Sequence, residues 1–106
     1  MTAISLARVR ADFVAEHTIE LGCLAGELGP HNIHVNCIAP GLILSSRAIA
    51  QGRNSEQARQ RLEPQIPLRR LGTPADCARV VEFLADDLSD YVTGQCIPVC
   101  GGFVAF

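Results

Sequence analysis

A short apolar stretch that stops at a Pro-Gly pair limits most strongly what this chain can fold into. Residues 33–43 read IHVNCIAPGLI, and Ile33, Val35, Cys37 and Ala39 alternate with the residues between them. A period of two is typical of a β-strand. Proline cannot donate a ladder hydrogen bond and glycine permits a sharp turn, so the strand should end at Pro40-Gly41. Any functional residues that this strand positions should therefore lie at its carboxyl end.

A helix is predicted before this strand, over about residues 4–28. The apolar pattern is weak at first and improves from Phe13, and it continues through Leu21, Leu24 and Leu28 at three- and four-residue steps. Gly29-Pro30 should end this helix, because glycine suits the cap and proline cannot continue the helix.

The clearest helix is predicted over about residues 74–86. Thr73 is placed to cap its amino end, Pro74 occupies a position where proline is tolerated, and Asp76 favours the first turn. Its buried stripe should comprise Cys77, Val80, Val81, Leu84 and Ala85.

A second strand is predicted over about residues 96–100, closed by Gly101-Gly102. Residues 45–66 between the first strand and the last helix are polar, with a short helix expected over about residues 55–62. Strands joined by a helical crossover should be parallel, with a right-handed connection. Each strand is nearly apolar on both of its faces, as parallel strands covered by helices should be. The predicted fold class is α/β, a piece of a doubly wound parallel sheet.

Composition excludes several kinds of function. The net charge is −2, there is no lysine, and the arginines are scattered, so no basic face for nucleic acid is indicated. The apolar runs are too short for a membrane span, and the first residues lack a secretory signal, which favours a cytoplasmic protein.

The cysteines and histidines do not indicate a metal site. The five cysteines lie in apolar periodic segments without a Cys-x-x-Cys motif, which predicts buried free thiols. His31, His34 and Cys37 have a spacing that suits a metal, but strand alternation puts His34 and Cys37 on opposite faces. No metal is therefore expected.

Four segments occur in the order LAGELGPHNIHVNCIAPGLI, IPLRRLGTPADCARVVEFLADD, SDYVTGQ and IPVCGG. In order and spacing they resemble the carboxyl-terminal part of the short-chain dehydrogenase/reductases (SDRs), the Rossmann-fold NAD(P)-dependent oxidoreductases. The resemblance covers about residues 14–102. It implies an incomplete, Rossmann-like doubly wound parallel sheet, with residues 1–106 forming a truncated domain. NIHVNCIAPGLI and RRLGTPADCA look like the branch that contains acyl-carrier-protein ketoreductases and carbonyl reductases.

The resemblance implies a cofactor site after the first predicted strand. In the family, this turn reaches the carboxamide of the nicotinamide ring of NAD or NADP, and here the matching residues are Pro40, Gly41, Ile43 and Ser45. Glycine permits close approach and residue 43 offers backbone hydrogen bonds. Residues 45–66 match the family's substrate lid. Taken alone, Pro40-Gly41 could be only a strand terminator, and residues 45–66 only a solvated loop.

The family's catalytic pair is not found in this sequence. The family uses Tyr-x-x-x-Lys, in which the tyrosine is the general acid/base, and the corresponding positions here hold Arg10 and Val14. The only tyrosine, Tyr91, belongs to another segment, and the glycine-rich phosphate loop is missing. We therefore assign no catalytic residue and expect the chain alone to be inactive.

Two functions remain open. The chain is expected to be a fragment of an NAD(P)-dependent ketone or alcohol reductase, with 3-oxoacyl substrates as one option. Its small-molecule substrate would be a carbonyl compound or an alcohol. The alternative is a non-enzymatic assembly module that uses the family's oligomerisation surfaces.

Self-association is also predicted. The strand at 33–39 should lack a neighbour on one edge, and the helix before it should lack the sheet face that it covers. Exposed Phe13, Leu21, Leu24 and Leu28 would then make the chain a homo-oligomer or prone to aggregation.

Overall fold

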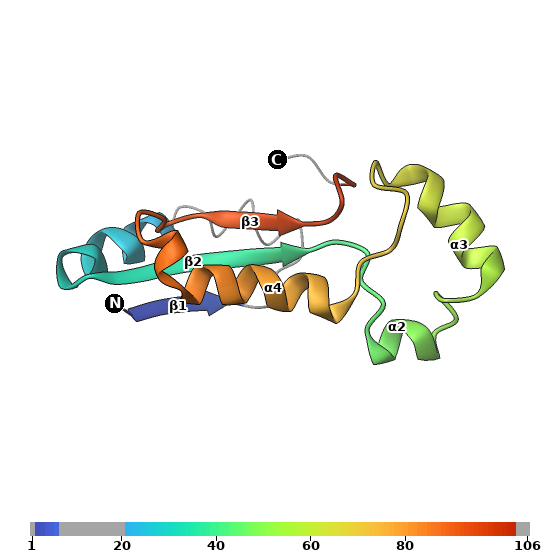
Figure 1. Cartoon of the computed structure of the whole chain (residues 1–106), viewed down its shortest axis with the longest axis horizontal. Helices are drawn as coiled ribbons and strands as arrows, with labels where there is room; N and C mark the ends of the chain where they lie inside the picture. The colour runs from blue at the N-terminus through green and yellow to red at the C-terminus, as the bar shows by residue number, and fades with distance from the viewer. Residues whose placement is uncertain (1, 7–20, 104–106) are drawn as a thin grey trace.

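The computed structural model describes residues 2–6 and 21–103. Residues 21–28 are helical. The other elements, in chain order, are β1 (Thr2–Leu6), η1 (Gly29–His31), β2 (Ile33–Pro40), α2 (Ser46–Ala50), α3 (Glu56–Leu62), η2 (Glu63–Gln65), α4 (Pro74–Ala85), η3 (Asp87–Ser89) and β3 (Cys96–Val99) (Figure 1).

The strands form one parallel sheet in the order β1-β2-β3. Cys37 of β2 lies opposite Cys96 of β3, and Pro40 lies opposite Val99, so the two strands end side by side. This confirms the two predicted parallel strands and the α/β fold class, with α4 in the connection between them.

The first strand corrects the sequence prediction. The helix was expected to begin at about residue 4, but Thr2–Leu6 forms β1 and pairs with β2 from Thr2 opposite Ile33 to Leu6 opposite Cys37. The helical stripe was weak there, and pairing with the edge of β2 satisfies the backbone groups of both segments. The edge of β2 that was expected to be open is therefore occupied by β1, and the prediction that an unpaired edge drives self-association is wrong.

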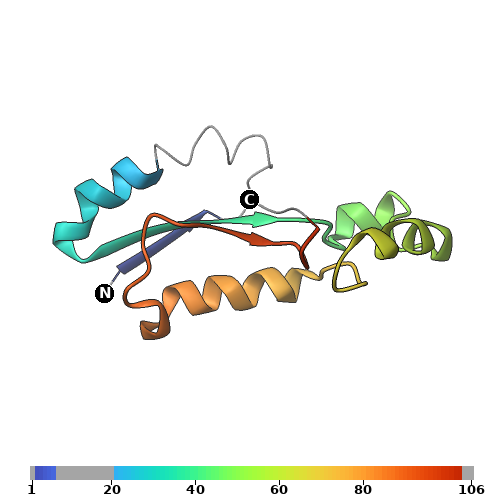
Figure 2. The same ribbon diagram turned by 90° about the horizontal axis from the view of Figure 1, so that it is seen from above.

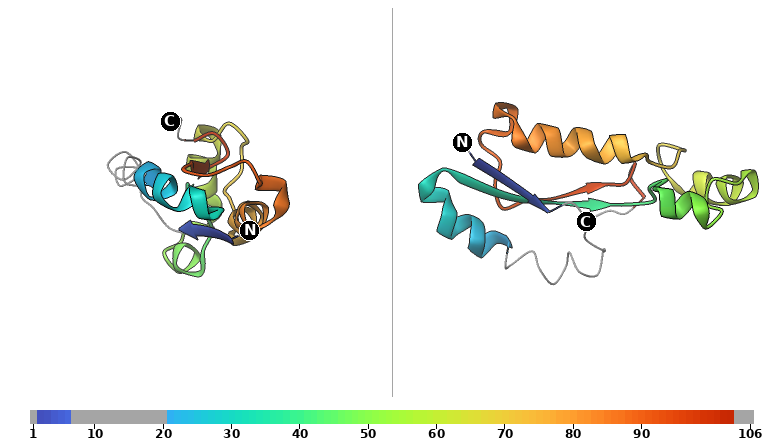
Figure 3. Two further views of the ribbon diagram at one scale, coloured as in Figure 1. Left: turned by 90° about the vertical axis from the view of Figure 1, so that its left-hand side faces the viewer. Right: turned by 90° about the horizontal axis from the view of Figure 1, so that it is seen from below.

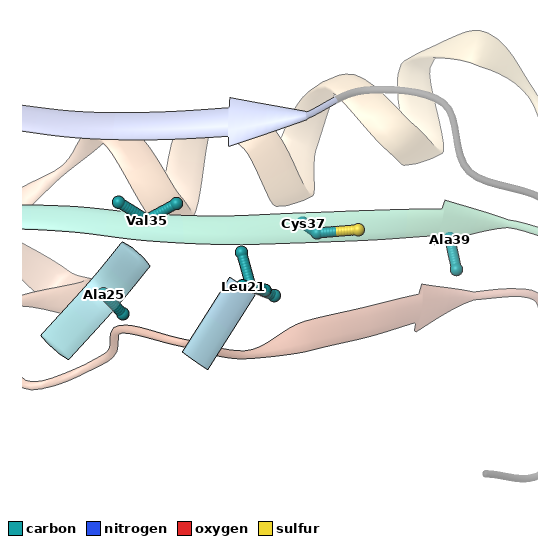
Figure 4. Close-up of a cluster of buried hydrophobic side chains, with 5 residues drawn as sticks. All are labelled: Leu21, Ala25, Val35, Cys37 and Ala39. Atoms are coloured by element: carbon teal, nitrogen blue, oxygen red, sulfur yellow. The ribbon is translucent and has the colours of Figure 1, made fainter. Parts of the chain in front are cut away.

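The helical segment 21–28 and α4 cover opposite faces of the sheet (Figures 2 and 3). On one face, Leu21 and Ala25 of the helical segment 21–28 pack against β2 (Figure 4). Their partners are Val35, Cys37 and Ala39, which alternation places on one side of the strand.

The four apolar residues expected to be exposed do not behave alike. Leu21 is buried and Leu28 is partly buried, so the prediction that this helix has lost its sheet face is wrong for both. Leu24 is 43% exposed, as expected, and Phe13 lies outside the described residues. Self-association itself stays a prediction.

The other face of β2 is more polar than the sequence analysis expected. The His34 ring lies with Nδ1 3.0 Å from the carbonyl oxygen of Val92, and the Asn36 amide donates to the same oxygen at 3.2 Å. The Asn36 Oδ1 accepts from the Gln95 N–H at 3.2 Å. Because both side chains are buried and hydrogen-bonded, they fix the segment before β3 against β2. The strand is not apolar on both faces.

Helix α4 follows its predicted pattern closely. The Thr73 hydroxyl accepts from the Asp76 N–H, and the Asp76 carboxylate accepts from the Thr73 N–H, which completes a capping box. Leu84 is fully buried. Ala85 is exposed, so the predicted stripe is wrong at that position, while the other three members, Cys77, Val80 and Val81, are half-buried.

The segment at residues 45–66 is more regular than predicted. It contains α2 and η2 in addition to the expected short helix, which is α3. These elements lie beyond the carboxyl ends of β2 and β3 (Figure 1). In the part of the chain that the structure describes, no helix has the length and apolar character needed to cross a membrane.

Candidate functional site

The carboxyl ends of β2 and β3 are held together by Gly41. Its N–H donates to the Val99 carbonyl at 2.9 Å. A Cβ at Gly41 would lie 2.7 Å from the Cβ of Cys100 and 2.9 Å from its Cα, distances that no side chain tolerates. Glycine is therefore required here because two backbone segments meet at the strand ends.

The backbone after Gly41 makes a short parallel ladder with Gly72. The Leu44 N–H donates to the Gly72 carbonyl at 2.8 Å, and the Gly72 N–H donates to the Leu42 carbonyl at 2.9 Å. In a parallel bridge of this kind, the N–H and C=O of the central residue, here Ile43, point away from the partner. The Ile43 carbonyl accepts from the Ser45 N–H, and its N–H is directed away from Gly72.

Ser45 caps helix α2. Its Oγ accepts a hydrogen bond from the Ala48 N–H at 3.2 Å. A hydroxyl that accepts in this way keeps its own proton for a second partner. The cap thus fixes the Ser45 oxygen while leaving a donor available.

A pocket of about 280 Å³ opens beside this turn. Its size is near the lower end of ligand-binding pockets. Of the four predicted site residues, Ile43 lines the pocket, and Gly41 lies next to Cys100, which also lines it. Pro40 and Ser45 are not in its wall. The lining residues are Leu42, Ile43, Leu68, Arg70, Gly72, Asp76, Pro98, Val99, Cys100 and Gly101.

An ion pair closes one side of the pocket. Arg70 donates to both Asp76 oxygens, at 2.7 and 3.1 Å, and the Thr73 N–H donates to Asp76 at 2.8 Å. The Arg70 hydrogen bonds, and next the Thr73 N–H, hold the pKa of the Asp76 carboxyl well below its usual range. From the sequence, Asp76 was predicted only as part of the helix start, and its pairing with Arg70 was not predicted. The one available signal was an arginine six residues before the acid.

This ion pair leads to a pH-dependent prediction. The pKa of Asp76 is lower in the folded chain than in the unfolded one, so its stabilising effect is present above about pH 4 and is lost as the pH falls toward the folded pKa. Asp76→Asn should lower the Tm at neutral pH, and its Tm difference from the wild type should shrink on acidification. Thermal unfolding followed by circular dichroism between about pH 7 and about pH 2 measures this.

Asp87→Asn is the matched control for Asp76→Asn. Among the described residues, the Asp87 side chain is in no ion pair, so its replacement should change the Tm little at any pH. A Tm difference for Asp76→Asn that stayed constant across the pH range would contradict the role given to the carboxylate.

The only tyrosine of the chain, Tyr91, does not lie near this turn. Tyr91 is fully exposed in the segment before β3, which is the amino end of the parallel strands, whereas Pro40-Gly41 is at their carboxyl end. Arg10 and Val14 lie outside the described residues. Across residues 2–6 and 21–103, His, Cys, Asp and Glu side chains form no group of three that could hold a metal ion.

Comparison with known sequences places most of this chain within one family. Residues 21–104 match the family model described as enoyl-(acyl carrier protein) reductase. The chain is 53% identical over 79 residues to the cyclohexanol dehydrogenase of Rhodococcus sp. (strain TK6), covering 74% of this chain and 28% of that protein. It is 44% identical over 79 residues to the 3-oxoacyl-[acyl-carrier-protein] reductase of Aquifex aeolicus (strain VF5), covering 74% and 31%.

Solved structures share the fold. A 3-oxoacyl-[acyl-carrier protein] reductase from Brucella melitensis ATCC 23457 superposes with a TM-score of 0.76 at 33% identity, over 90% of this chain and 35% of that one. A 7α-hydroxysteroid dehydrogenase in complex with NADH has a TM-score of 0.71 at 35% identity, over 87% and 35%.

The chain thus spans less than a third of the length of these two curated relatives. Residues 21–104 match the family model, and 90% of the chain superposes on a solved reductase at 33% identity. This chain belongs to the short-chain dehydrogenase/reductase family.

Proposed function

We propose that this chain supplies the nicotinamide-side wall and the substrate lid of an NAD(P)-dependent oxidoreductase that interconverts ketones and alcohols. The observation that carries the proposal is the turn at residues 40–45, which lies at the carboxyl ends of two parallel strands beside a pocket. Open α/β sheets bind their ligands at this end of the strands.

The backbone of the turn suits a carboxamide. Such a group has one acceptor oxygen and an NH₂ donor. The Ile43 N–H, and the lone pair of its C=O that Ser45 does not use, offer the complementary pair. The Ser45 hydroxyl adds a donor fixed by its cap on α2. NAD or NADP would contribute the hydride chemistry, while these residues would hold and orient the nicotinamide ring.

The segment from α2 to Leu68 suits an apolar or mixed substrate. Ile49 is 49% exposed and Leu68 is 66% exposed, and Leu68 also lines the pocket. Apolar side chains that border a pocket with a few polar groups are typical of small-molecule sites. A ketone or an alcohol is the proposed substrate class, and similarity to 3-oxoacyl reductases makes a 3-oxoacyl thioester a first choice for assays.

Binding at the turn can be tested on the full chain by NMR. We expect reduced nicotinamide mononucleotide to shift the backbone amide signals of residues 41–45, because that half of the cofactor carries the carboxamide. Adenosine monophosphate should leave the same signals unchanged, because the chain shows no phosphate loop to receive it. Equal shifts with both nucleotides, or shifts away from the turn only, would overturn the proposed site.

The chain alone is predicted to have no dehydrogenase activity. It contains no lysine, Arg10 and Val14 stand at the matching catalytic positions, and Tyr91 lies at the other end of the strands. The missing acid/base group would contribute about 10²–10⁴-fold, and the missing phosphate loop would hold the cofactor, so we expect no turnover above background. NADH and NADPH oxidation with simple ketones and acetoacetyl thioesters measures this, and a rate proportional to added chain would contradict it.

A further inference from the structure

Two cysteine thiols meet between the strands, one on β2 and one on β3. Cys37 and Cys96 are direct partners in the parallel register, and their Sγ atoms lie 3.2 Å apart. Both thiols are free, Cys37 is buried, and Cys96 packs against the same cluster beneath the helical segment 21–28.

The backbone around these thiols already suits a disulfide. Neighbouring strands lie about 4.7–4.9 Å apart, within the roughly 4.4–6.8 Å between Cα atoms that a disulfide needs. Register partners also point their side chains to the same face of the sheet. Bond formation requires that the sulfur atoms close from 3.2 Å to about 2 Å and that the side chains rotate to a Cβ–S–S–Cβ dihedral of about ±90°.

We propose that Cys37 and Cys96 form a dithiol site that low-molecular-weight disulfides oxidise to an intramolecular disulfide joining β2 to β3. This site lies three residues before Pro40 and does not depend on the proposed function. Of the other three cysteines, Cys23 is exposed on the helical segment, so its predicted burial is wrong, Cys77 is on α4, and Cys100 follows the end of β3.

The reaction begins at Cys96, the more accessible of the two thiols. Burial, and next the hydrogen bond with Cys96, raises the pKa of the Cys37 thiol to about 12, so Cys37 is the poorer nucleophile. The Cys96 thiolate attacks the oxidant, whose S–S bond breaks and releases one thiol. Cys37, after losing its proton, attacks Sγ of Cys96 and displaces the second thiol. The two protein thiols lose two electrons and two protons, and the oxidant becomes two thiols.

The bond should stabilise the chain. It would close a loop between residues that are 59 positions apart, which restricts the unfolded chain strongly. We expect the oxidised chain to unfold at a Tm higher by about 10 °C or more than the reduced chain.

Disulfide mapping on the full wild-type chain tests the site. The reduced chain is incubated with oxidised glutathione, free thiols are blocked in acid, and linked peptides are sequenced by tandem mass spectrometry. A parallel sample is oxidised in urea, where loop length alone favours the nearest pair, Cys96 and Cys100. The Cys37–Cys96 link should dominate in the native sample and fall to a minor product in urea.

Variants and the melting temperature complete the test. Cys77→Ser should leave the native product unchanged, whereas Cys96→Ser should abolish it and leave no intramolecular link to Cys37. The wild-type mapping does not depend on whether Cys96→Ser folds. A native sample with the same products as the urea sample, links between chains only, or an oxidised form with a lower Tm than the reduced one would overturn the proposal.

Discussion

Leu84→Ala is expected to lower the free energy of unfolding by about 2–5 kcal/mol, the largest effect of any single substitution considered for this chain. Leu84 is fully buried on α4, which contacts all three strands. Removing its isobutyl group loses the free energy of transferring that group out of water and leaves a cavity that the sheet cannot collapse to fill. Since domains of this size are stable by about 5–15 kcal/mol, the variant should lose a large part of its total stability.

Phe83→Ala is the matched control, because Phe83 precedes Leu84 on the same helix but is 39% exposed. Its truncation should cost clearly less, since much of the ring already contacts water. Urea unfolding followed by circular dichroism measures both variants. Equal losses for the two would show that α4 does not cover the sheet as described.

Gly41→Ala is expected to destabilise the chain by about 1–3 kcal/mol and to weaken nicotinamide binding at the turn. The new Cβ would meet Cys100 at 2.7 Å on its side chain and 2.9 Å on its backbone, so the strand ends must move apart. Because the Gly41 N–H also donates to Val99, that movement weakens the hydrogen bond that joins the two ends.

Gly26→Ala provides the same substitution without the clash. No atom lies within 4 Å of a Cβ built there, and the residue is exposed in the helical segment. Alanine should therefore stabilise the chain by about 0.5–1 kcal/mol through helix propensity. Opposite signs for the two variants in urea unfolding are the expected result, and equal destabilisation would contradict the packing described at Gly41.

Local sequence predicted the elements that are encoded locally. Thr73, Pro74 and Asp76 mark the start of α4 with three independent signals, and the alternation from Ile33 to Ala39 marks β2. In both elements the apolar periodicity and the capping or turn residues indicate the same structure, and secondary-structure predictions are most reliable where such signals agree.

The features that the sequence did not predict depend on contacts between residues far apart in the chain. β1 has few residues and a weak pattern, and it is a strand because β2 offers an edge to it. The burial of His34 and Asn36 depends on Val92 and Gln95, which are more than fifty positions away.

The candidate site also contains both locally encoded residues and contacts between distant parts of the chain. Pro40 and Gly41 were predicted because a turn carries its own residue signature, although the contact of Gly41 with Cys100 was not. The Arg70 ion pair and the meeting of Cys37 with Cys96 follow from geometry and register, which the spacing of residues does not reveal.

The central claim is that this chain carries a working nicotinamide-side turn and substrate lid. A chimera tests it most directly: residues 21–103 replace the matching segment of the 3-oxoacyl reductase of Aquifex aeolicus, which supplies the remaining parts. The measurement is the rate of NADH and NADPH oxidation with a 3-oxoacyl thioester or a simple ketone. We expect turnover that Gly41→Ala lowers and Gly26→Ala does not. A folded chimera that binds NADH or NADPH without turnover on any of these substrates would contradict the claim.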